Sequence, residues 1–292
     1  MQMNCLESDT QKISVAPAAK QTTTLADLRF GCVSYLNSRP FLAALDGIDV
    51  ACGPPSQLAE KLRKGDLDCA LIPIWECLAH PGYRLIDGLC IGCHGSVYSV
   101  ILTHTRPLRE LQTIALDLHS QTSVRLLQVL CRKHFKIDPL FVDEHTASEA
   151  PSAVTGRLLI GDRAIQERER GELKENEKSD ENDRHDTVRI IDLGEAWCDY
   201  TGGLGFIFAV WAIHPKSAMN AEQIKTFRRL LLENVEDQAL HRCAANAFEK
   251  RYLTECIRYT IGPEQKEGFQ QFSRELAELS LIPGNAPKLD WV

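Results

Sequence analysis

The feature that most constrains the fold is a repeated alternation of short apolar runs with amphipathic helical segments, which begins at Leu28. The run "LRFGCVSYL" is typical of a strand, and "DCALIPI" is typical of a buried strand. Between them, "PSQLAEKLRKGD" predicts a helix with Ser56 as its N-cap and Gly65 just after its end. A strand, a helix and a strand in this order predict a βαβ unit, so the expected fold class is α/β, with a parallel or mixed sheet covered by helices.

The same alternation continues along the chain and indicates two lobes. Two long apolar strands, at 96–104 and 206–213, bracket a central block with strands and helices of its own. A chain that leaves one lobe and later returns to it has this pattern, and lobe boundaries are where small ligands commonly bind. The expected bounds are 27–103 and 209–292 for the first lobe and 104–208 for the second.

Two segments are expected to lie outside the packed lobes. Residues 1–26 are polar, contain no apolar run long enough for a signal peptide, and predict a flexible leader. Residues 166–186 contain almost no apolar side chains and a dense mixture of charges. Such a composition predicts an exposed, mobile insertion on the second lobe.

Composition excludes several classes of partner. The net charge is −7 and the basic residues are scattered, which argues against a nucleic-acid partner. No apolar run approaches the roughly 20 residues of a membrane span, so we expect a cytoplasmic protein with no membrane partner. Most cysteines lie in apolar runs, as reduced core cysteines do. Cys90 and Cys93 have CxxC spacing beside His94, but no second pair follows, so two small thiols at a strand end are preferred over a metal or redox site.

Polar side chains cluster at three expected strand ends, where ligands of α/β sheets bind. The three groups are Ser34 with Asn37 and Ser38; Ser120 with Thr122 and Ser123; and Gly161 with Asp162. The second group opens a helix, so its hydroxyls and free backbone N–H groups suit a carboxylate or phosphate, with simple N-capping as the equally weighted alternative. A fourth, weaker candidate is the loop "CHGSVYS", which carries Ser96 and Ser99. No GxGxxG or Walker A motif is present, which disfavours nucleotide cofactors.

Six blocks, in order, resemble the menaquinone biosynthesis enzymes of the futalosine route, and most closely the chorismate dehydratase family. The blocks are "VSYLNSRP", "GDLDCALIPIWECL", "GLCIGCHGSVYSVIL", "SQTSVRLLQVLCRKHF", "LLIGDRAI" and "DLGEAWCDYTGGLGFIFAVWA". The resemblance implies a type II periplasmic-binding-protein-like fold with the ligand between two lobes. It also implies removal of water from chorismate to give 3-[(1-carboxyvinyl)oxy]benzoate, with no metal or organic cofactor.

The resemblance carries residue roles onto this chain. Asn37 matches the cleft asparagine of the family and Ser99 the serine after the glycine loop, and both are expected to be catalytic. Thr122 and Ser123 match the Thr-Ser pair of the family, and Gly161 and Asp162 match its "LIGD" block, so these four are expected to bind substrate. Ser34 and Ser120, from the groups at the strand ends, complete the expected substrate-binding residues. No strong general base is apparent, so the hypothesis is that the side-chain carboxylate of chorismate, oriented by Asn37, accepts the proton.

Some alternatives stay open at this point. The sister enzyme that makes 1,4-dihydroxy-6-naphthoate shares the fold, and a non-catalytic protein that binds an aromatic acid is a second possibility. Trp75 is expected either in the core or in the cleft wall. Glu76 is interpreted as a favourable charge at a helix N-terminus and not as a catalyst. The oligomeric state is not determined by the sequence.

Overall fold

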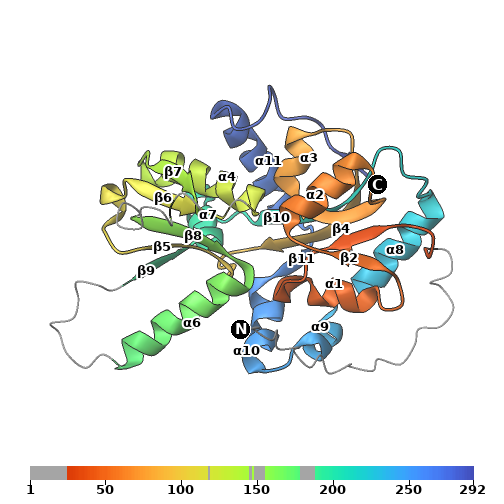
Figure 1. Ribbon diagram of the computed structural model, residues 1–292, viewed down its shortest axis with the longest axis horizontal. Helices are drawn as coiled ribbons and strands as arrows, with labels where there is room; N and C mark the ends of the chain where they lie inside the picture. The colour runs from red at the N-terminus through yellow and green to blue at the C-terminus, as the bar shows by residue number, and fades with distance from the viewer. Residues whose placement is uncertain (1–24, 118, 145–146, 148–154, 178–187) are drawn as a thin grey trace, which may run out of the picture.

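The computed structural model has a mixed α/β architecture with two sheets, as predicted (Figure 1). It describes residues 25–117, 119–144, 147, 155–177 and 188–292, with the backbone alone for 171–177. Within those residues, no helix combines the length and the apolar character needed to cross a bilayer. Residues 1–24 and 178–187, in the expected leader and insertion, lie outside the described part of the chain.

The first sheet has seven strands in the order β11-β4-β10-β3-β1-β2, with β12 added beside β4. Its strands are β1 (Phe30–Cys32), β2 (Val50–Cys52), β3 (Cys69–Pro73), β4 (Arg84–Cys93), β10 (Phe206–Ile213), β11 (Arg258–Thr260) and β12 (Asp290–Trp291). Strand β1 runs parallel to β2 and β3, while β10 runs antiparallel to β3 and β4. The sheet is therefore mixed, and its centre, β3, is buried along its whole length.

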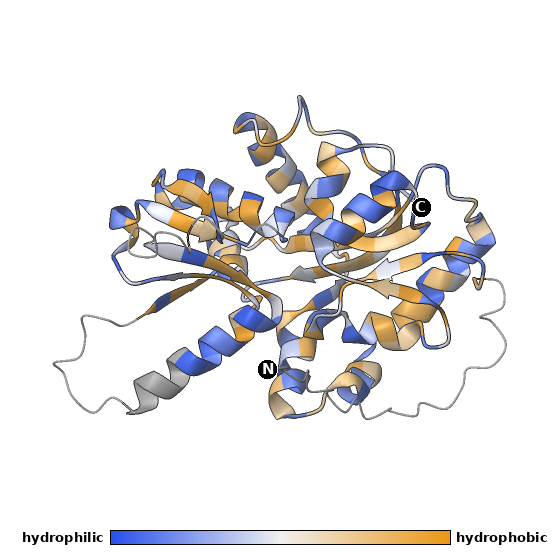
Figure 2. Cartoon of the chain, viewed as in Figure 1, coloured by the Kyte–Doolittle hydropathy of each residue, from blue (hydrophilic) through white to orange (hydrophobic). Residues whose placement is uncertain are grey.

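The second sheet has five strands in the order β7-β6-β8-β5-β9. Its strands are β5 (Val100–His104), β6 (Thr113–Leu116), β7 (Leu140–Asp143), β8 (Gly156–Ile160) and β9 (Arg189–Asp192). The apolar residues of both sheets face helices, so the hydrophobic colouring concentrates in the interior of each lobe (Figure 2).

Helices cover both sheets. The helices of the first lobe are α1 (Arg39–Ala44), α2 (Pro55–Lys64), α3 (Ile74–Ala79), α8 (Ala221–Glu233), α9 (Asp237–Cys243), α10 (Ala247–Arg251) and α11 (Pro263–Glu278). Those of the second are α4 (Gln121–Leu130), α6 (Gly161–Glu177) and α7 (Leu193–Thr201). Helix α4 continues into a π-helical turn (Cys131–Phe135), and α10 continues into another, η7 (Tyr252–Cys256).

Helix α2 shows which features of a helix the local sequence predicts correctly and which it does not. Leu58 and Leu62 are buried, as their spacing predicts, and the helix ends at Gly65, which adopts a left-handed conformation with φ +80°. The expected N-cap is wrong, because Pro54 precedes the helix and Ser56 lies inside its first turn. The Ser56 hydroxyl instead forms a 3.0 Å hydrogen bond with Nδ1 of His119 in the second lobe.

The structure corrects the expected bounds of the lobes. Strand β5, expected in the first lobe up to residue 103, pairs with β8 and β9 in the second sheet. Strand β10, expected in the second lobe up to residue 208, pairs with β3 and β4 in the first. The chain therefore crosses between the sheets in two loops, 94–99 and 202–205, which are joined by a 2.9 Å hydrogen bond between Nε2 of His94 and the carbonyl oxygen of Gly203. Periodicity located the apolar runs, but only strand pairing shows to which sheet each run belongs.

Two further expectations are corrected at their edges. Leu25, placed in the leader, is fully buried in the core, and its carbonyl oxygen accepts a hydrogen bond from the Leu28 N–H. The first part of the charged segment, 166–177, continues α6 as regular helix. Opposite charges one helical turn apart are compatible with a solvent-exposed helix. Composition alone does not distinguish such a helix from a disordered loop, because both are rich in charged residues.

Candidate active site between the lobes

A pocket lies between the two sheets and contains about 600 Å³ of space not filled by atoms, its open mouth included. The first lobe contributes Val33, Tyr35, Asn37, Pro55, Leu71, Ile72, Pro73, Ile91, Phe208 and Ala209. The crossing loop and the second lobe contribute Val97, Ser99, Val100, Ser120, Thr122, Ser123, Ile160 and Gly161. Mostly apolar walls with a few fixed hydroxyl and amide groups are typical of a site for a small organic molecule.

The hydroxyl-bearing residues at the start of α4 form one wall of this pocket. Ser120 occupies the N-cap position, yet its side chain makes no capping hydrogen bond and instead donates to the Ser123 hydroxyl at 2.7 Å. Thr122 Oγ1 accepts the Trp75 backbone N–H at 3.3 Å, which connects α4 to α3 of the other lobe. Simple N-capping, one of the two interpretations of this segment, therefore does not describe the structure.

The turn "SYLNSRP" places Asn37 in the pocket. Its residues Leu36–Ser38 form a single 3-10 turn, which the Ser38 hydroxyl fixes through hydrogen bonds to the carbonyl oxygens of Val33 (2.6 Å) and Tyr35 (2.8 Å). Among the described residues, the buried Oδ1 of Asn37 has no hydrogen-bond partner. A buried amide oxygen of this kind costs free energy unless a bound molecule supplies a donor.

Two expected site residues lie outside the pocket lining. Ser34 is exposed, one residue beyond Val33, and its side chain is not part of the wall. Asp162 is exposed as well, and its Oδ1 accepts the Leu36 backbone N–H at 3.2 Å. Asp162 thus joins the second lobe to the turn that holds Asn37, and it supports the site without lining it.

The electrostatics of the pocket come from the backbone. No lysine or arginine is among its lining residues in the described chain. The N-termini of α2, α3, α4 and α6 all contribute to the wall, through Pro55, Pro73, Ser120 and Gly161. Each N-terminus carries a partial positive charge from its free N–H groups, so their convergence favours an anionic ligand.

Gly161 closes the pocket against Tyr35. It has φ +58°, its N–H donates to the Ser99 carbonyl oxygen at 2.8 Å, and a Cβ there would lie 3.2 Å from the Tyr35 ring. Burial raises the pKa of the Tyr35 phenol, and the carboxylates of Asp117 and Asp162 raise it further.

Gly161→Ala is expected to destabilise the fold by about 1–2 kcal/mol through backbone strain and to weaken ligand binding by pushing the Tyr35 ring into the pocket. Thermal unfolding and a binding titration measure the two effects separately. The matched control is Gly47→Ala, since Gly47 has φ +83° but no atom within 4 Å of the added Cβ. If both variants lost the same affinity, the contact between the added Cβ at position 161 and the Tyr35 ring would not be the cause of the weaker binding.

Asp192 fixes the crossing loop that carries Ser99, and sequence reasoning missed it. Its side chain is fully buried at the end of β9. The carboxylate accepts hydrogen bonds from the Ser96 hydroxyl (2.7 Å), the N–H groups of Val97 (3.0 Å), Tyr98 (2.7 Å), Gly194 (2.9 Å) and Glu195 (3.1 Å), and the Arg168 guanidinium (3.1 Å). The loop was expected to be part of a long strand, but β5 begins only at Val100 because these contacts hold Ser96 to Tyr98 out of the sheet. The sequence signal available was an aspartate at the N-cap of α7, in "DLGEAW".

Tyr252 is a second group that sequence reasoning missed. It lies behind the pocket wall, is almost completely buried, and donates a 2.8 Å hydrogen bond to Ser99 Oγ. Nothing in the local pattern of its helical segment distinguishes it from an ordinary core tyrosine.

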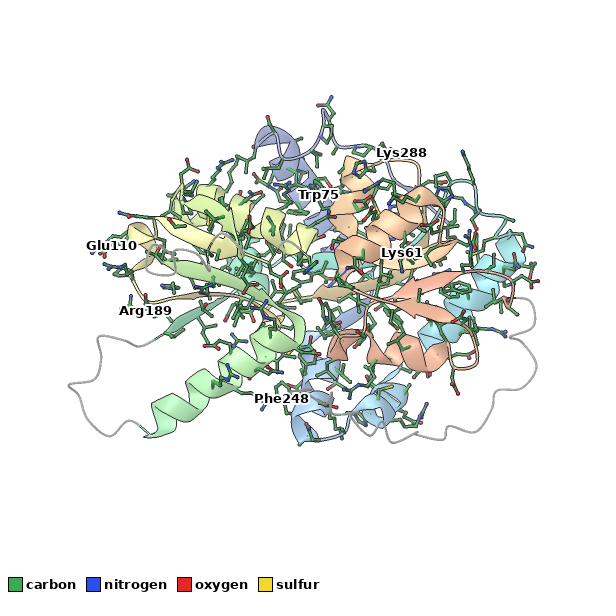
Figure 3. The ribbon with its side chains drawn as sticks, viewed as in Figure 1. Lys61, Trp75, Glu110, Arg189, Phe248 and Lys288 are labelled. Atoms are coloured by element: carbon green, nitrogen blue, oxygen red, sulfur yellow. The ribbon has the colours of Figure 1, made fainter. Side chains whose placement is uncertain are left out.

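Trp75 and Glu76 lie near the pocket without lining it. Trp75 lies on α3 (Figure 3). Its ring packs under the Arg125 guanidinium, 4.9 Å from the ring centroid, and its Nε1 donates to the Leu281 carbonyl oxygen. Trp75 therefore belongs to the junction between the lobes and not to the cleft wall. Glu76 is fully buried and paired with Arg63 at 2.6 Å, so its role is structural.

The CxxC pair is built into the first sheet. Cys90 and Cys93 are both buried in β4, where burial raises the pKa of each thiol, and His94 is engaged with Gly203. Across the described ranges, no three His, Cys, Asp or Glu side chains are grouped so that they could hold a metal ion.

Comparisons with known proteins place this architecture in a family. A family model described as menaquinone biosynthesis matches residues 28–278. A curated chorismate dehydratase of Thermus thermophilus is 28% identical over 257 residues, which cover 84% of this chain and 94% of that protein.

Solved structures agree on the fold. A protein of Archaeoglobus fulgidus superposes with a TM-score of 0.64 at 14% identity, covering 87% of this chain and 98% of that one. The alkanesulfonate-binding protein of Xanthomonas axonopodis pv. citri, bound to MOPS, superposes with a TM-score of 0.53 at 16% identity over 89% and 96%. The fold is thus the two-lobed, periplasmic-binding-protein-like one that the resemblance implied. With the family model matched across almost the whole described chain, this protein belongs to the menaquinone biosynthesis family.

Proposed function

We propose that this protein is a chorismate dehydratase, a hydro-lyase that removes water from chorismate to give 3-[(1-carboxyvinyl)oxy]benzoate. The observation that carries the proposal is the match to the curated dehydratase over 94% of its length. The pocket supports it independently, because its apolar walls and converging helix N-termini suit a ring with two carboxylates.

The elimination of water is redox-neutral, so it needs neither an oxidant nor a reductant. The C3–H bond of the ring breaks, and its electron pair becomes the new C3=C4 double bond. The C4–O bond breaks, and the departing hydroxyl takes up a proton and leaves as water. The ring becomes aromatic, so the driving force lies in the substrate, and the protein has to orient the dianion, exclude water and stabilise developing charge.

The polar side chains of the pocket have distinct roles in this scheme. The helix start with Ser120, Thr122 and Ser123 binds the ring carboxylate through its backbone N–H groups and hydroxyls. Asn37 orients the side-chain carboxylate of chorismate, which accepts the C3 proton. Ser99 donates a hydrogen bond to the departing C4 hydroxyl. Ser34 and Asp162 are not direct ligands in this scheme, since neither lines the pocket.

The test is incubation of the purified protein with chorismate, followed by chromatography with mass detection of substrate and product. The proposal expects loss of chorismate and an equal gain of the carboxyvinyloxy-benzoate, in the presence and absence of EDTA. Tight chorismate binding without turnover would instead indicate a binding protein. If the protein neither binds nor converts chorismate, the next compound to assay is the precursor of 1,4-dihydroxy-6-naphthoate, which is the product of the sister enzyme.

A further inference from the structure

Tyr252 connects the last third of the chain to the pocket through a single hydroxyl group. It is the first residue of η7, 153 positions away from Ser99 in the sequence, and its hydroxyl donates to Ser99 Oγ at 2.8 Å. Both groups are buried, with 1% of each residue exposed. Within the described residues, Ser99 belongs to the pocket lining and Tyr252 does not. The phenol therefore does not line the pocket itself, and its 2.8 Å hydrogen bond to Ser99 links it to a residue that does.

The direction of this hydrogen bond determines what Ser99 can do. Since the oxygen of Ser99 accepts the Tyr252 proton, the proton of Ser99 itself is left to be donated elsewhere. Within the protein, the Ser99 hydroxyl can also donate to the Val97 carbonyl oxygen, but this contact is 3.4 Å, which is long for an O–H···O hydrogen bond. An acceptor on a bound ligand in the pocket would offer the Ser99 proton a shorter contact.

The surroundings of Tyr252 keep its hydroxyl protonated and in place. Burial raises the pKa of the Tyr252 phenol, and the lowering effects of the nearby Ser99 and Asn37 side chains do not overcome this rise. Phe248 stacks on the ring with centroids 6.2 Å apart, and Tyr98 packs at 6.5 Å. A phenol that stays neutral and fixed is a permanent hydrogen-bond donor.

We infer that Tyr252 is a positioning residue of the dehydration: its hydroxyl holds Ser99 so that the Ser99 O–H points into the pocket, toward the C4 hydroxyl of bound chorismate. This inference rests on the proposed function. Tyr252 transfers no proton to the substrate in this scheme. Its hydrogen bond polarises Ser99 and fixes its rotamer, while the C4–O bond breaks and the oxygen leaves as water.

The test compares two buried tyrosines. Tyr252→Phe removes only the hydroxyl, and the expected result is a fall in kcat of about 10- to 100-fold with KM changed less than about threefold. The matched control is Tyr259→Phe, because Tyr259 is also buried but its hydroxyl has no hydrogen-bond partner among the described residues. Tyr259→Phe is expected to retain the wild-type kcat and to be at least as stable in thermal unfolding.

A double-mutant cycle separates positioning from a general structural effect. In a Ser99→Ala background, Tyr252→Phe is expected to lower kcat by less than about twofold, since Tyr252 acts through the hydroxyl that is already absent. Independent, multiplicative losses would overturn the inference, as would a Tyr252→Phe protein with wild-type kcat.

A second replacement tests the same contact if the phenylalanine variant folds poorly. Site-specific incorporation of 3-fluorotyrosine at position 252 keeps the ring and the hydroxyl, and therefore the donor to Ser99. This variant is expected to keep kcat within about threefold of the wild type, and a loss as large as that expected for Tyr252→Phe would contradict the role of the hydroxyl. A wild-type protein that leaves chorismate unchanged would overturn the proposed function itself, whereas an active wild type with an unaffected Tyr252→Phe would overturn this inference alone.

Discussion

Asn37→Ala is expected to lower kcat for chorismate dehydration by about 10²- to 10³-fold, the range found when a fixed polar group of a catalytic site is removed. The structural reason is its place in the pocket lining, on a turn fixed by Ser38. In the proposed scheme its Nδ2 group donates to the substrate carboxylate, while its buried Oδ1, which has no protein partner in the described chain, accepts a hydrogen bond from a substrate hydroxyl. An oriented amide adds no charge to a site that has to accept a dianion. Steady-state kinetics with product detection measure the effect.

Asn37→Asp distinguishes an orienting amide from a protein base. If the substrate carboxylate is the proton acceptor, a third carboxylate at position 37 repels the dianion, and both affinity and kcat are expected to fall. An active Asn37→Asp with a new acid-limb pKa, together with a near-normal Asn37→Ala, would contradict the hypothesis. The control is Asn220→Ala, which removes the N-cap of α8 far from the pocket and is expected to cost about 1 kcal/mol of stability with kcat unchanged.

Asp192→Asn is expected to be the most destabilising single change, lowering the free energy of unfolding by about 3–5 kcal/mol. The buried carboxylate accepts five N–H and O–H hydrogen bonds and pairs with Arg168. An amide can accept at only one of its two positions, so it leaves donors unpaired and the Arg168 charge without its partner. Denaturant unfolding monitored by circular dichroism gives the change.

The same substitution is expected to lower activity under conditions where the variant is still folded. Asp192 holds Ser96 to Tyr98, and this loop leads directly into Ser99. The control is Asp199→Asn, an exposed position on α7, the helix that Asp192 caps, and it is expected to change stability by less than about 0.5 kcal/mol. A folded Asp192→Asn protein with normal kcat would show that the loop keeps its conformation without the carboxylate.

Local sequence patterns predicted the elements of this protein well, because those elements depend on short-range physics. Apolar runs became the strands of two sheets, Gly65 ended α2 in a left-handed conformation, and the hydroxyls after β6 opened α4 beside the pocket. The ordered blocks also predicted the family and the two-lobed fold, and the comparisons confirm both.

What the local patterns could not determine is which distant groups meet. The assignment of β5 to the second sheet depends on its pairing with β8 and β9 and not on its own composition. Ser56 suits an N-cap locally, but its partner is His119 in the other lobe.

The sequence alone determined the α/β elements, the family and a pocket at strand ends, since periodicity, turn residues and ordered blocks record these directly. Only the tertiary structure shows which buried groups hold the pocket residues in place. These are the Asp192 carboxylate, which accepts hydrogen bonds from the crossing loop, and the Tyr252 hydroxyl, which donates to Ser99 although the two are 153 residues apart in the sequence. A buried polar side chain is stabilised by whichever partner the fold brings to it, and the identity of that partner is a property of the packed chain and not of its neighbours in sequence.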